Sequence, residues 1–342
     1  MKNDRKEITM KDIAAHFGVS TATVSRALSD SPSISPQRRQ AIQDYAREHD
    51  FVPNPIGRQL RHVREHPSRL IGVILPQMVH YYFSTVLSGI EETASQRGYQ
   101  IICAQSNEDP EREKQICHNF HRNRVCGVIV SQAKGTKTYE HFHLLQDSGI
   151  PLVFYDRIST GIEASRVVVD DYNGAFEAVC HLAKCGYKRI AFYGSPMNME
   201  ISKNRYNGYK DAIFHSKLSQ TPDLVFNCDD RTTALDLTPL VMRCPNPPDA
   251  FFCVNDDTAI GVLHALKYLG CDVPSKIGIC GFTNGERAIA CDPMLTTVEQ
   301  RGHRLGQEAA NILIDQAEGI LPKDKVQRRI IRTKLIVRGT TK

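Results

Sequence analysis

The fold of one end of this chain follows from the stretch Ile8-Thr9-Met10-Lys11-Asp12-Ile13-Ala14-Ala15-His16-Phe17-Gly18-Val19-Ser20-Thr21-Ala22-Thr23-Val24-Ser25-Arg26-Ala27-Leu28. The stretch predicts two short helices around a tight turn. Thr9 and Ser20 are residue types that cap helix N-termini, and Gly18 tolerates the left-handed backbone that ends a helix. Apolar residues recur at helical spacing on one face of each predicted helix, so the pair can pack on a small core.

The other face of the second predicted helix has small and hydroxylated side chains near its N-terminus, followed by an arginine. In a major groove, hydroxyls can contact phosphates or base edges, the methyl of Ala22 can meet a thymine methyl, and Arg26 can reach a guanine edge. An alternative stays open, namely a capped helical hairpin in any small bundle. The candidate DNA-contacting residues of this stretch are Thr9, Ser20, Thr21, Ala22, Thr23, Ser25, Arg26 and Ser29.

Length and charge limit the number of folding units and the class of partner. A chain of 342 residues is too long for one ordinary domain, so two or three units are expected. The formal net charge of +5 is uneven, because residues 1–69 contain 12 basic and 8 acidic residues and the rest contains 31 and 30. A basic head on a nearly neutral body indicates a polyanion at one end only.

Cysteine usage and the N-terminus predict where the protein works. The chain has 11 cysteines but no Cys-x-x-Cys pair, so zinc-site spacing is absent, and small buried hydrophobes in a reducing cytosol explain them most simply. Residues 1–7 are charged and lack the apolar run of a signal peptide, and no stretch could span a membrane. We therefore expect a cytoplasmic, nucleoid-associated protein without a metal or other cofactor.

The head (8–52) is completed by a third helix. Pro36 follows a potential N-cap serine and suits the first helical position. The helix is predicted to run from Pro36 to about residue 50. The residues expected to face inward are Ile42, Tyr45, Ala46 and His49.

A proline-bounded hinge (53–67) comes next. Pro53 and Pro55 forbid a continuous helix, and the helix that could start after them is too short to be stable alone. A plain interdomain linker is the alternative, but arginines beside an exposed Leu60 fit a wedge inserted into a minor groove. The candidate DNA-contacting residues of the hinge are Asn54, Gly57, Arg58 and Leu60.

Two runs in this region resemble the DNA-binding head and hinge of the lactose-repressor (LacI/GalR) family of bacterial transcription regulators. They are Val19-Ser20-Thr21-Ala22-Thr23-Val24-Ser25-Arg26 and the run from Pro53-Asn54-Pro55 to Leu60. The resemblance implies that Thr21, Ala22 and Arg26 read the major groove and that Leu60 is a minor-groove lever. It also implies that the hinge helix folds only on operator DNA, paired with its copy from a second subunit.

The body (68–342) alternates predicted strands and helices. Repeated βαβ units indicate doubly wound parallel sheets, and two sets of strands indicate two lobes of the periplasmic-binding-protein type. The first set is predicted at 70–75, 99–103, 125–130 and 152–155, and the second at 167–169, 189–193, 224–226, 250–254 and 277–280. The expected N-lobe covers about 68–165 and 297–324, and the C-lobe about 166–296 and 325–342. The predicted fold is thus an all-α helix-turn-helix head plus an α/β body.

Ligands of such sheets bind at the carboxyl ends of the strands, so the candidate effector residues come from the loops there. Aromatic rings with carboxylates, amides and arginines suit a polyhydroxylated ligand such as a sugar. Each residue also has a plainer role open to it, as helix-start packing or as an N-cap. The candidates are Tyr82, Phe83, Arg157, Asp171, Arg205, Asn255, Asp256 and Thr283.

The body resembles the effector-binding core of the same family, which is similar to periplasmic sugar-binding proteins. The segments 293–300 and 335–338 extend the resemblance over nearly the whole chain. The family often has an aspartate where this chain has Thr283-Asn284, and this departure leaves the ligand open. Arg205 together with Arg157 suggests a sugar acid or sugar phosphate.

These observations predict a ligand-responsive, homodimeric repressor of carbohydrate-metabolism genes that binds a pseudo-palindromic operator and is not an enzyme. A dimer is expected because the hinge helix would pair with its copy from a second subunit, and a tetramer is not expected because no helical heptad extension follows the final strand-like run. The alternatives are a sugar-binding transport or sensing protein and an α/β enzyme. Against an enzyme, the chain lacks a Gly-rich phosphate loop, a Gly-x-Ser-x-Gly elbow and a metal-ligand cluster. His118, His121, His141 and His143 are predicted to be solvated on polar helix faces.

Overall fold

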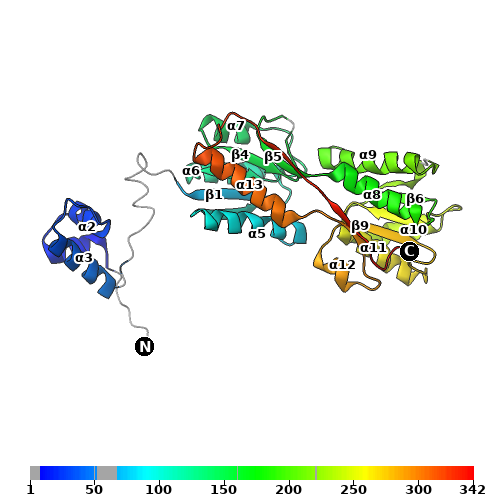
Figure 1. Ribbon diagram of the computed structural model, residues 1–342, viewed down its shortest axis with the longest axis horizontal. Coiled ribbons are helices and arrows are strands. Elements are labelled where there is room, and N and C mark those ends of the chain that lie inside the picture. Colours follow the sequence, from blue (N-terminus) through cyan, green and yellow to red (C-terminus); the bar gives the residue numbers. More distant parts are fainter. Residues whose placement is uncertain (1–7, 50, 52–67, 160, 220–221) are drawn as a thin grey trace. The chain divides into compact units, whose positions relative to one another are not determined.

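A computed structural model describes residues 8–49, 51, 68–159, 161–219 and 222–342, and the chain divides into two units, Met1–Ser68 and Arg69–Lys342 (Figure 1). The hinge candidates Asn54, Gly57, Arg58 and Leu60 lie outside the described residues. The two units are the head and the body.

The head contains the three predicted helices. They are α1 (Met10–Phe17), α2 (Thr21–Leu28) and α3 (Pro36–Glu48). Thr9 and Asp12 form a capping box at the start of α1, and Gly18 ends the helix at φ +59°. A small shared core joins the helices and consists of Ile13, Ala14, Val24, Ala27, Ile42 and Ala46.

One inward prediction in the head is wrong. The side chain of His49 is exposed because α3 ends before it, at Glu48. Its ring stacks on Tyr45 at 4.2 Å between centroids, and Tyr45 in turn stacks on His16 at 4.1 Å. The three rings therefore form a stack on the surface of the head.

The first lobe of the body is a six-stranded sheet in the order β11-β5-β4-β3-β1-β2. All its pairs are parallel, and the central strands β1, β3 and β4 are buried runs of mostly apolar residues, as the sequence predicts for 70–75. The edge strands β2 and β11 are mostly exposed or half-buried. The strands are β1 (Leu70–Leu75), β2 (Gln100–Gln105), β3 (Gly127–Val130), β4 (Leu152–Tyr155), β5 (Ser165–Val169) and β11 (Arg328–Ile331).

Helices cover both faces of this sheet. On one face α5 (Tyr81–Gln96) and α13 (Gly302–Ala317) pack against each other and on the strands. Their backbones approach closely, since a Cβ added at Gly306 would collide with the carbonyl oxygen of Val86. The other face packs on α6 (Pro110–Arg122) and α7 (Glu140–Asp147).

The second lobe is a six-stranded sheet in the order β12-β10-β9-β8-β6-β7, in which only the pairing of β10 with β12 is antiparallel. Its strands are β6 (Ile190–Gly194), β7 (Val225–Asn227), β8 (Ala250–Cys253), β9 (Gly278–Thr283), β10 (Thr296–Glu299) and β12 (Lys334–Ile336). The short 3-10 helix η1 (Pro222–Leu224) precedes β7. One face packs on α10 (Arg231–Met242), α11 (Asp256–Tyr268) and the short α12 (Glu286–Ala290), and the other on α8 (Asp171–Lys184) and α9 (Glu200–His215).

The chain crosses between the lobes at three places, after β5, after β10 and after β11 (Figure 1). The expected lobe boundaries are therefore wrong for three strands, because β5 and β11 lie in the first sheet and β10 lies in the second. The reason is physical: an apolar run shows that a strand is buried, but it does not show which of two sheets buries it.

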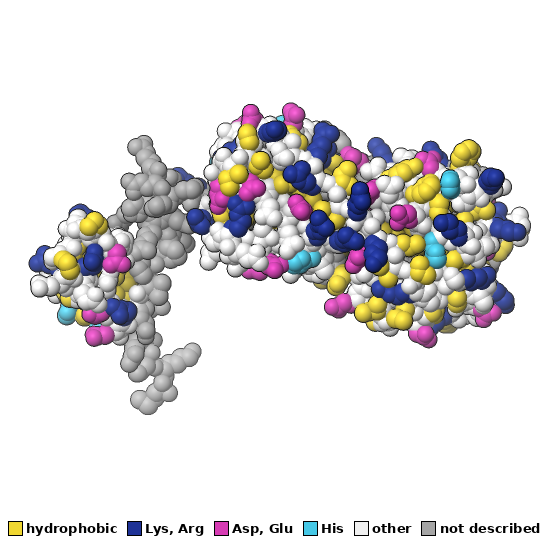
Figure 2. All heavy atoms as spheres, viewed as in Figure 1, with side chains coloured by type: hydrophobic (Ala, Val, Ile, Leu, Met, Phe, Trp, Pro, Cys, Tyr) yellow, Lys and Arg dark blue, Asp and Glu magenta, His cyan; other side chains and the backbone are white. Residues whose placement is uncertain are grey.

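The surface of the body agrees with its nearly neutral composition. Figure 2 shows basic and acidic side chains interspersed over the visible face of the body. Among the described helices, none is long and apolar enough to cross a membrane.

Candidate functional site

The open face of α2 is the part of the head predicted to contact DNA. Ala22 and Arg26 are exposed, and Thr21, Thr23 and Ser25 are half-buried along the same helix. Within the described part of the chain, no ion pair engages Arg26. Its guanidinium is therefore available for a base edge or a phosphate.

Three other candidate residues of the head form hydrogen bonds at the ends of helices. The amide of Thr9 donates to the Asp12 carboxylate at 2.7 Å, and Ser20 Oγ accepts from the Thr23 amide at 3.2 Å. Ser29 Oγ donates to the carbonyl of Ser25 at 2.9 Å. The first contact caps α1, and the other two lie at the ends of α2; within α2 itself, Ala22 and Arg26 are the exposed candidates.

Arg205 is the charged residue at the centre of the body. It lies on α9 and is only 8% exposed. Its Nε donates to Asp171 Oδ1 at 2.8 Å, and its Nη1 donates to the Val254 carbonyl at 2.6 Å. The guanidinium carbon lies 4.0 Å from the ring centroid of Phe282, which is a cation–π geometry. These contacts hold the guanidinium between the start of α8 and the strands β8 and β9.

Asp171 is available to Arg205 because its neighbour caps the helix. The N-cap of α8 is Asp170, whose Oδ1 accepts from the Asn173 amide at 3.3 Å. The capping role that the sequence left open for Asp171 is thereby filled by another residue. Burial raises the pKa of the Asp171 carboxyl to about 7, with Arg205 opposing the rise and Asp156 adding to it.

The first lobe contributes Tyr82 and Asp156 to the same place. Both are 8% exposed. Burial raises the pKa of Asp156, while Arg157 and Arg205 act to lower it. Burial also raises the pKa of Tyr82, and the Asp156 and Asp171 carboxylates add to that rise. We call Tyr82, Asp156, Asp171 and Arg205 the central cluster; it joins polar groups from both lobes.

The Tyr82 hydroxyl is buried close to the Asp156 carboxyl and acts to lower the pKa of that carboxyl, so the two groups form the first-lobe side of the central cluster. Phe83 lies beside Tyr82 and is only 5% exposed; the guanidinium of Arg157 lies 5.6 Å from the Phe83 ring centroid.

Two other candidate effector residues of the second lobe, Asn255 and Asp256, form hydrogen bonds that stabilise loops. Asn255 caps α11 by accepting from the Thr258 amide at 2.8 Å, and its Nδ2 donates to the Asp229 carbonyl at 2.7 Å. Asp256 accepts a hydrogen bond from the Thr297 hydroxyl and another from the Gly285 amide at 2.8 Å. Burial raises the pKa of Asp256 to about 6, and these two hydrogen bonds oppose the rise.

Thr283 is the last residue of β9 and is half-buried, with a positive φ of 152°. No hydrogen bond between described residues links Asn255, Asp256 or Thr283 to the central cluster. The structure thus groups Tyr82, Asp171 and Arg205, whereas Asn255 and Asp256 form hydrogen bonds that hold loops of the second lobe and Thr283 ends β9.

A cavity of about 340 Å³ lies between the lobes, beside the loops that follow β3 and β4. Of the candidate effector residues, only Arg157 lines it. Its other lining residues include Gln132, Lys134, Tyr139 and Asn198, which the sequence analysis did not select. Because three of these follow β3, the strand-end rule applied to that strand would have found them.

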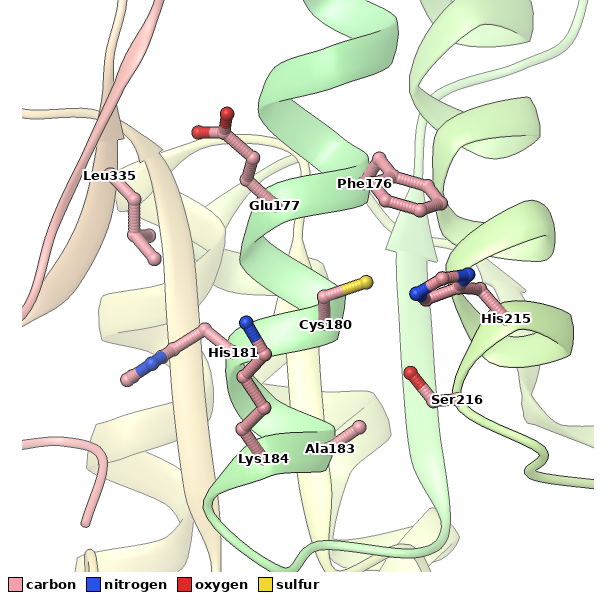
Figure 3. Close-up of a pocket in the computed structure, with 9 residues that line it drawn as sticks. All are labelled: Phe176, Glu177, Cys180, His181, Ala183, Lys184, His215, Ser216 and Leu335. Atoms are coloured by element: carbon pink, nitrogen blue, oxygen red, sulfur yellow. The ribbon is translucent and has the colours of Figure 1, made fainter.

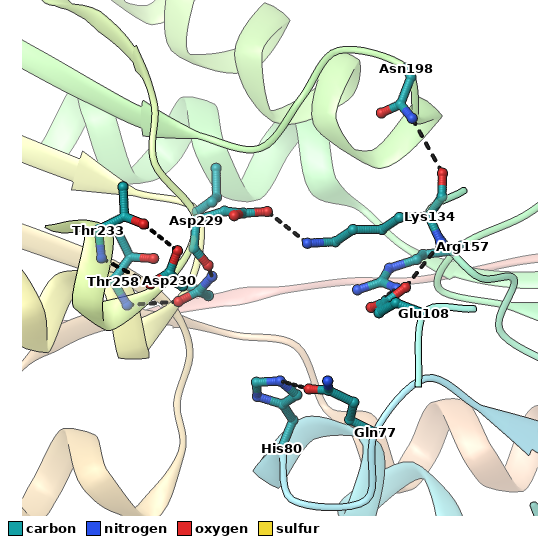
Figure 4. Close-up of polar contacts among 12 residues, drawn as sticks. Gln77, His80, Glu108, Lys134, Arg157, Asn198, Asp229, Asp230, Thr233 and Thr258 are labelled. Atoms are coloured by element: carbon teal, nitrogen blue, oxygen red, sulfur yellow. Dashed lines mark hydrogen bonds and ion pairs between the residues drawn. The ribbon is translucent and has the colours of Figure 1, made fainter. Parts of the chain in front are cut away.

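Two further residues near this cavity, Glu108 and Asp229, were also missed. Glu108 accepts a hydrogen bond from Arg157, and its Oε2 accepts from the Lys134 amide at 2.9 Å (Figure 4). Lys134 Nζ pairs with Asp229 Oδ2 of the second lobe at 2.8 Å. The positive φ of Glu108, 62°, marks a loop whose conformation is specified by its contacts.

A larger groove of about 620 Å³ lies on α8 and α9 and contains none of the candidate effector residues (Figure 3). Its walls include Phe176, Cys180, His181 and His215, which project from the two helices. These residues lie on helices and not at strand ends, so the groove is separate from the predicted effector site.

The prediction that all four helix histidines are solvated is wrong for His141. His118 and His143 are exposed and His121 is half-buried, but His141 is only 3% exposed. Its Nε2 lies 3.2 Å from Oε1 of Glu113, which is itself fully buried on α6. A buried carboxylate needs partners, and α7 supplies this one. Among the described residues, no group of histidines, cysteines and carboxylates could hold a metal ion.

Comparison with known proteins agrees with both units. Residues 9–54 match "Bacterial regulatory proteins, lacI family", and residues 179–341 match "Periplasmic binding protein-like domain". The chain is 31% identical over 346 residues to the HTH-type transcriptional repressor CytR of Escherichia coli K12, covering 100% of this chain and 98% of the relative. It is 29% identical to the HTH-type transcriptional repressor PurR of Haemophilus influenzae, covering 98% of each chain.

Solved structures show the same fold. The lac repressor dimer bound to operator and the anti-inducer ONPF superimposes with a TM-score of 0.83 at 22% identity, covering 98% of this chain and 99% of that one. The transcriptional regulator CelR in complex with cellobiose gives a TM-score of 0.73 at 23% identity, covering 97% and 99%. From the identity to CytR over the full length, the chain belongs to the LacI/GalR family of bacterial transcription regulators, and it is a DNA-binding regulator and not an enzyme.

Proposed function

We propose that the protein is a homodimeric repressor of carbohydrate-metabolism genes that binds a pseudo-palindromic operator and responds to a small-molecule effector. The observation that carries the effector part is the central cluster, in which both lobes place buried polar groups at one point. A ligand held there contacts both lobes at once, so its binding can change the angle between them.

The charge of the central cluster favours a neutral, polyhydroxylated effector. Asp156 and Asp171 oppose the single positive charge of Arg205, and Arg157 is already paired with Glu108. A sugar hydroxyl can donate to a carboxylate and accept from a guanidinium, whereas a sugar acid or phosphate would meet two carboxylates. The structure solved with CelR contains cellobiose, a neutral sugar, which is in line with this class.

The effector class has a direct test. Calorimetry of the intact protein should detect binding of neutral sugars and no binding of their acidic or phosphorylated forms. Tight binding of only a sugar phosphate would contradict the charge argument.

For operator binding, two heads related by a two-fold axis would place their α2 helices in successive major grooves of a pseudo-palindrome. The hinge residues Asn54, Gly57, Arg58 and Leu60 would contact the minor groove between them. The lac repressor structure in the comparison is a dimer on its operator, which supports this arrangement. The protein would then act in the cytoplasm at the nucleoid, where its operator lies.

Selection from random-sequence duplexes with the intact protein tests operator binding. Enrichment of a palindromic duplex at low ionic strength is expected, with affinity that falls steeply as salt rises. Arg26→Ala should cost about 1–3 kcal/mol and relax the preference at one base pair of each half-site. Arg38→Ala, at an exposed arginine of α3, is the matched control and should leave the sequence preference unchanged. Failure to enrich any palindrome would refute the proposal.

A substitution at Leu60 tests the proposed minor-groove wedge of the hinge. Leu60→Ser should weaken operator binding and leave sugar binding intact, because the change removes only the apolar wedge. Equal operator affinity of the variant and the parent protein would exclude a wedge role for Leu60.

A further inference from the structure

An ion pair crosses the cleft between the lobes. Lys134, on the loop after β3, places Nζ 2.8 Å from Oδ2 of Asp229, on the loop after β7. Figure 4 shows the lysine side chain extending across to this carboxylate. The side-chain nitrogen Nδ2 of Asn198, also in the second lobe, donates to the Lys134 carbonyl at 3.3 Å. Both contacts exist only while the lobes are close, because their partners come from opposite sides of the cleft.

Both ends of this bridge are held in place by their own lobes. The Asp229 carbonyl accepts from Asn255, which is anchored as the N-cap of α11. The Lys134 amide donates to Glu108 at 2.9 Å. The flexible lysine stem therefore starts from a fixed backbone position, which lowers the entropy cost of forming the pair.

A buried carboxylate holds the lysine loop from beneath. Glu113 Oε2 accepts from the Ala133 amide at 2.7 Å, and its Oε1 accepts from the Thr136 hydroxyl at 2.6 Å. His141 Nε2 also contacts this carboxylate, at 3.2 Å. Glu113 is fully buried on α6 and does not line the cavity. Glu113 is therefore placed to hold the residues on either side of Lys134, and it is not placed to bind a ligand.

We propose that Lys134 and Asp229 form a latch that holds the lobes closed before any effector binds, and that Glu113 is the positioning residue that presents Lys134 to Asp229. The latch rests on the proposed function only in assuming that the lobes move. It predicts that the free protein already favours the closed arrangement, and that an effector needs to supply less free energy to keep it closed.

The test measures the separation of the lobes in the intact protein without DNA or effector. Pulsed electron paramagnetic resonance reports this distance between two spin labels. Each label is attached to a ketone-bearing amino acid, at the exposed positions Asn119 on α6 and Asn207 on α9. Ketone chemistry is needed because the chain has 11 cysteines. Lys134→Met and Asp229→Asn should each raise the ratio of open to closed molecules roughly threefold to fivefold, the effect of a partly exposed ion pair.

Two controls separate the pair from a general charge effect. Lys137→Met changes a lysine of the same loop that is exposed and has no ion pair among the described residues, so it should leave the distances unchanged. The charge swap Lys134→Asp with Asp229→Lys should restore the closed population. Unchanged distances in the single variants, an equal shift in Lys137→Met, or a swap that fails to restore closure would each overturn the latch.

The positioning role is tested with Glu113→Gln. This variant should open the lobes like Lys134→Met and should speed hydrogen exchange at the amides of 133–136. Faster exchange without a change in lobe distance would show that Glu113 supports the loop but does not position the latch. Since no operator or sugar is present, none of these results bears on DNA binding or on the effector class.

Discussion

The buried pair of Arg205 and Asp171 gives the sharpest stability prediction. Arg205→Met keeps an unbranched side chain of similar reach but removes the charge. It leaves Asp171, which is 4% exposed, without the guanidinium that donates to it at 2.8 Å. The Val254 carbonyl also loses its donor.

The size of the effect follows from burial. Breaking a buried ion pair by removing one partner costs about 3–5 kcal/mol where the remaining group stays charged, and we expect about 4 kcal/mol at pH 9 and less at pH 7. The pKa of Asp171 in the parent protein is about 7, well above the value near 4 of the unfolded chain, so this group stabilises the fold below pH 4 and that contribution is lost as the pH rises through 7. In Arg205→Met the pKa rises further, because Arg205 had opposed the rise. The loss then continues above pH 7, and the cost of the substitution should grow by up to about 1.4 kcal/mol per pH unit.

The assay is urea unfolding followed by far-ultraviolet circular dichroism at pH 7 and pH 9, since the chain has no tryptophan to report by fluorescence. Asp171→Asn and the double variant complete a cycle, in which we expect a coupling energy of about 2 kcal/mol. The double variant should also lack the added cost at pH 9. A coupling below about 0.5 kcal/mol, or an equal cost of Arg205→Met at both pH values, would refute the reasoning.

Two further predictions concern other parts of the chain. Ser20→Ala removes the oxygen that accepts from the Thr23 amide, so it should lower the stability of the head by about 1 kcal/mol, measured by hydrogen exchange of the α2 amides, while exchange in the body stays unchanged. Asp256, whose pKa is raised to about 6, contributes stability that is present below pH 4 and lost as the pH rises through 6. Asp256→Asn should therefore flatten the fall in melting temperature between pH 4 and 7; a slope equal to that of the parent protein would contradict the assignment.

Much of the fold could be predicted from local pattern. The strand predicted at 70–75 is confirmed as β1 because a central parallel strand is apolar along its whole length. The caps at Thr9 and Ser20 are confirmed because an N-cap depends on residues only three positions apart. The lobe of β5 could not be predicted, since membership of a sheet depends on strands far along the chain.

For the candidate site as well, features set by local sequence could be predicted and contacts between distant residues could not. Asp171 was found because it follows a predicted strand, and Arg205 because it begins a polar and aromatic pattern on a predicted helix; the structure brings the two together. The strand-end rule could have found Lys134, but its pairing with Asp229 could not be predicted because it joins loops of different lobes, 95 residues apart. His141 was misjudged because its helix face is polar in sequence, and its burial depends on the position of Glu113 on another helix. Contacts of this kind are visible only in three dimensions.

The three crossings between the lobes have a consequence for synthesis. The first sheet lacks its edge strand β11, and its layer lacks α13, until residues 302–331 have left the ribosome. Leu305, Ala309 and Leu313 of α13 are fully buried in that layer, so the nascent body exposes their apolar partners for nearly the whole of translation. The head can fold long before this. During translation the head is therefore folded while the body attached to it is still incomplete. The exposed apolar surface that chaperones would bind lies in the body.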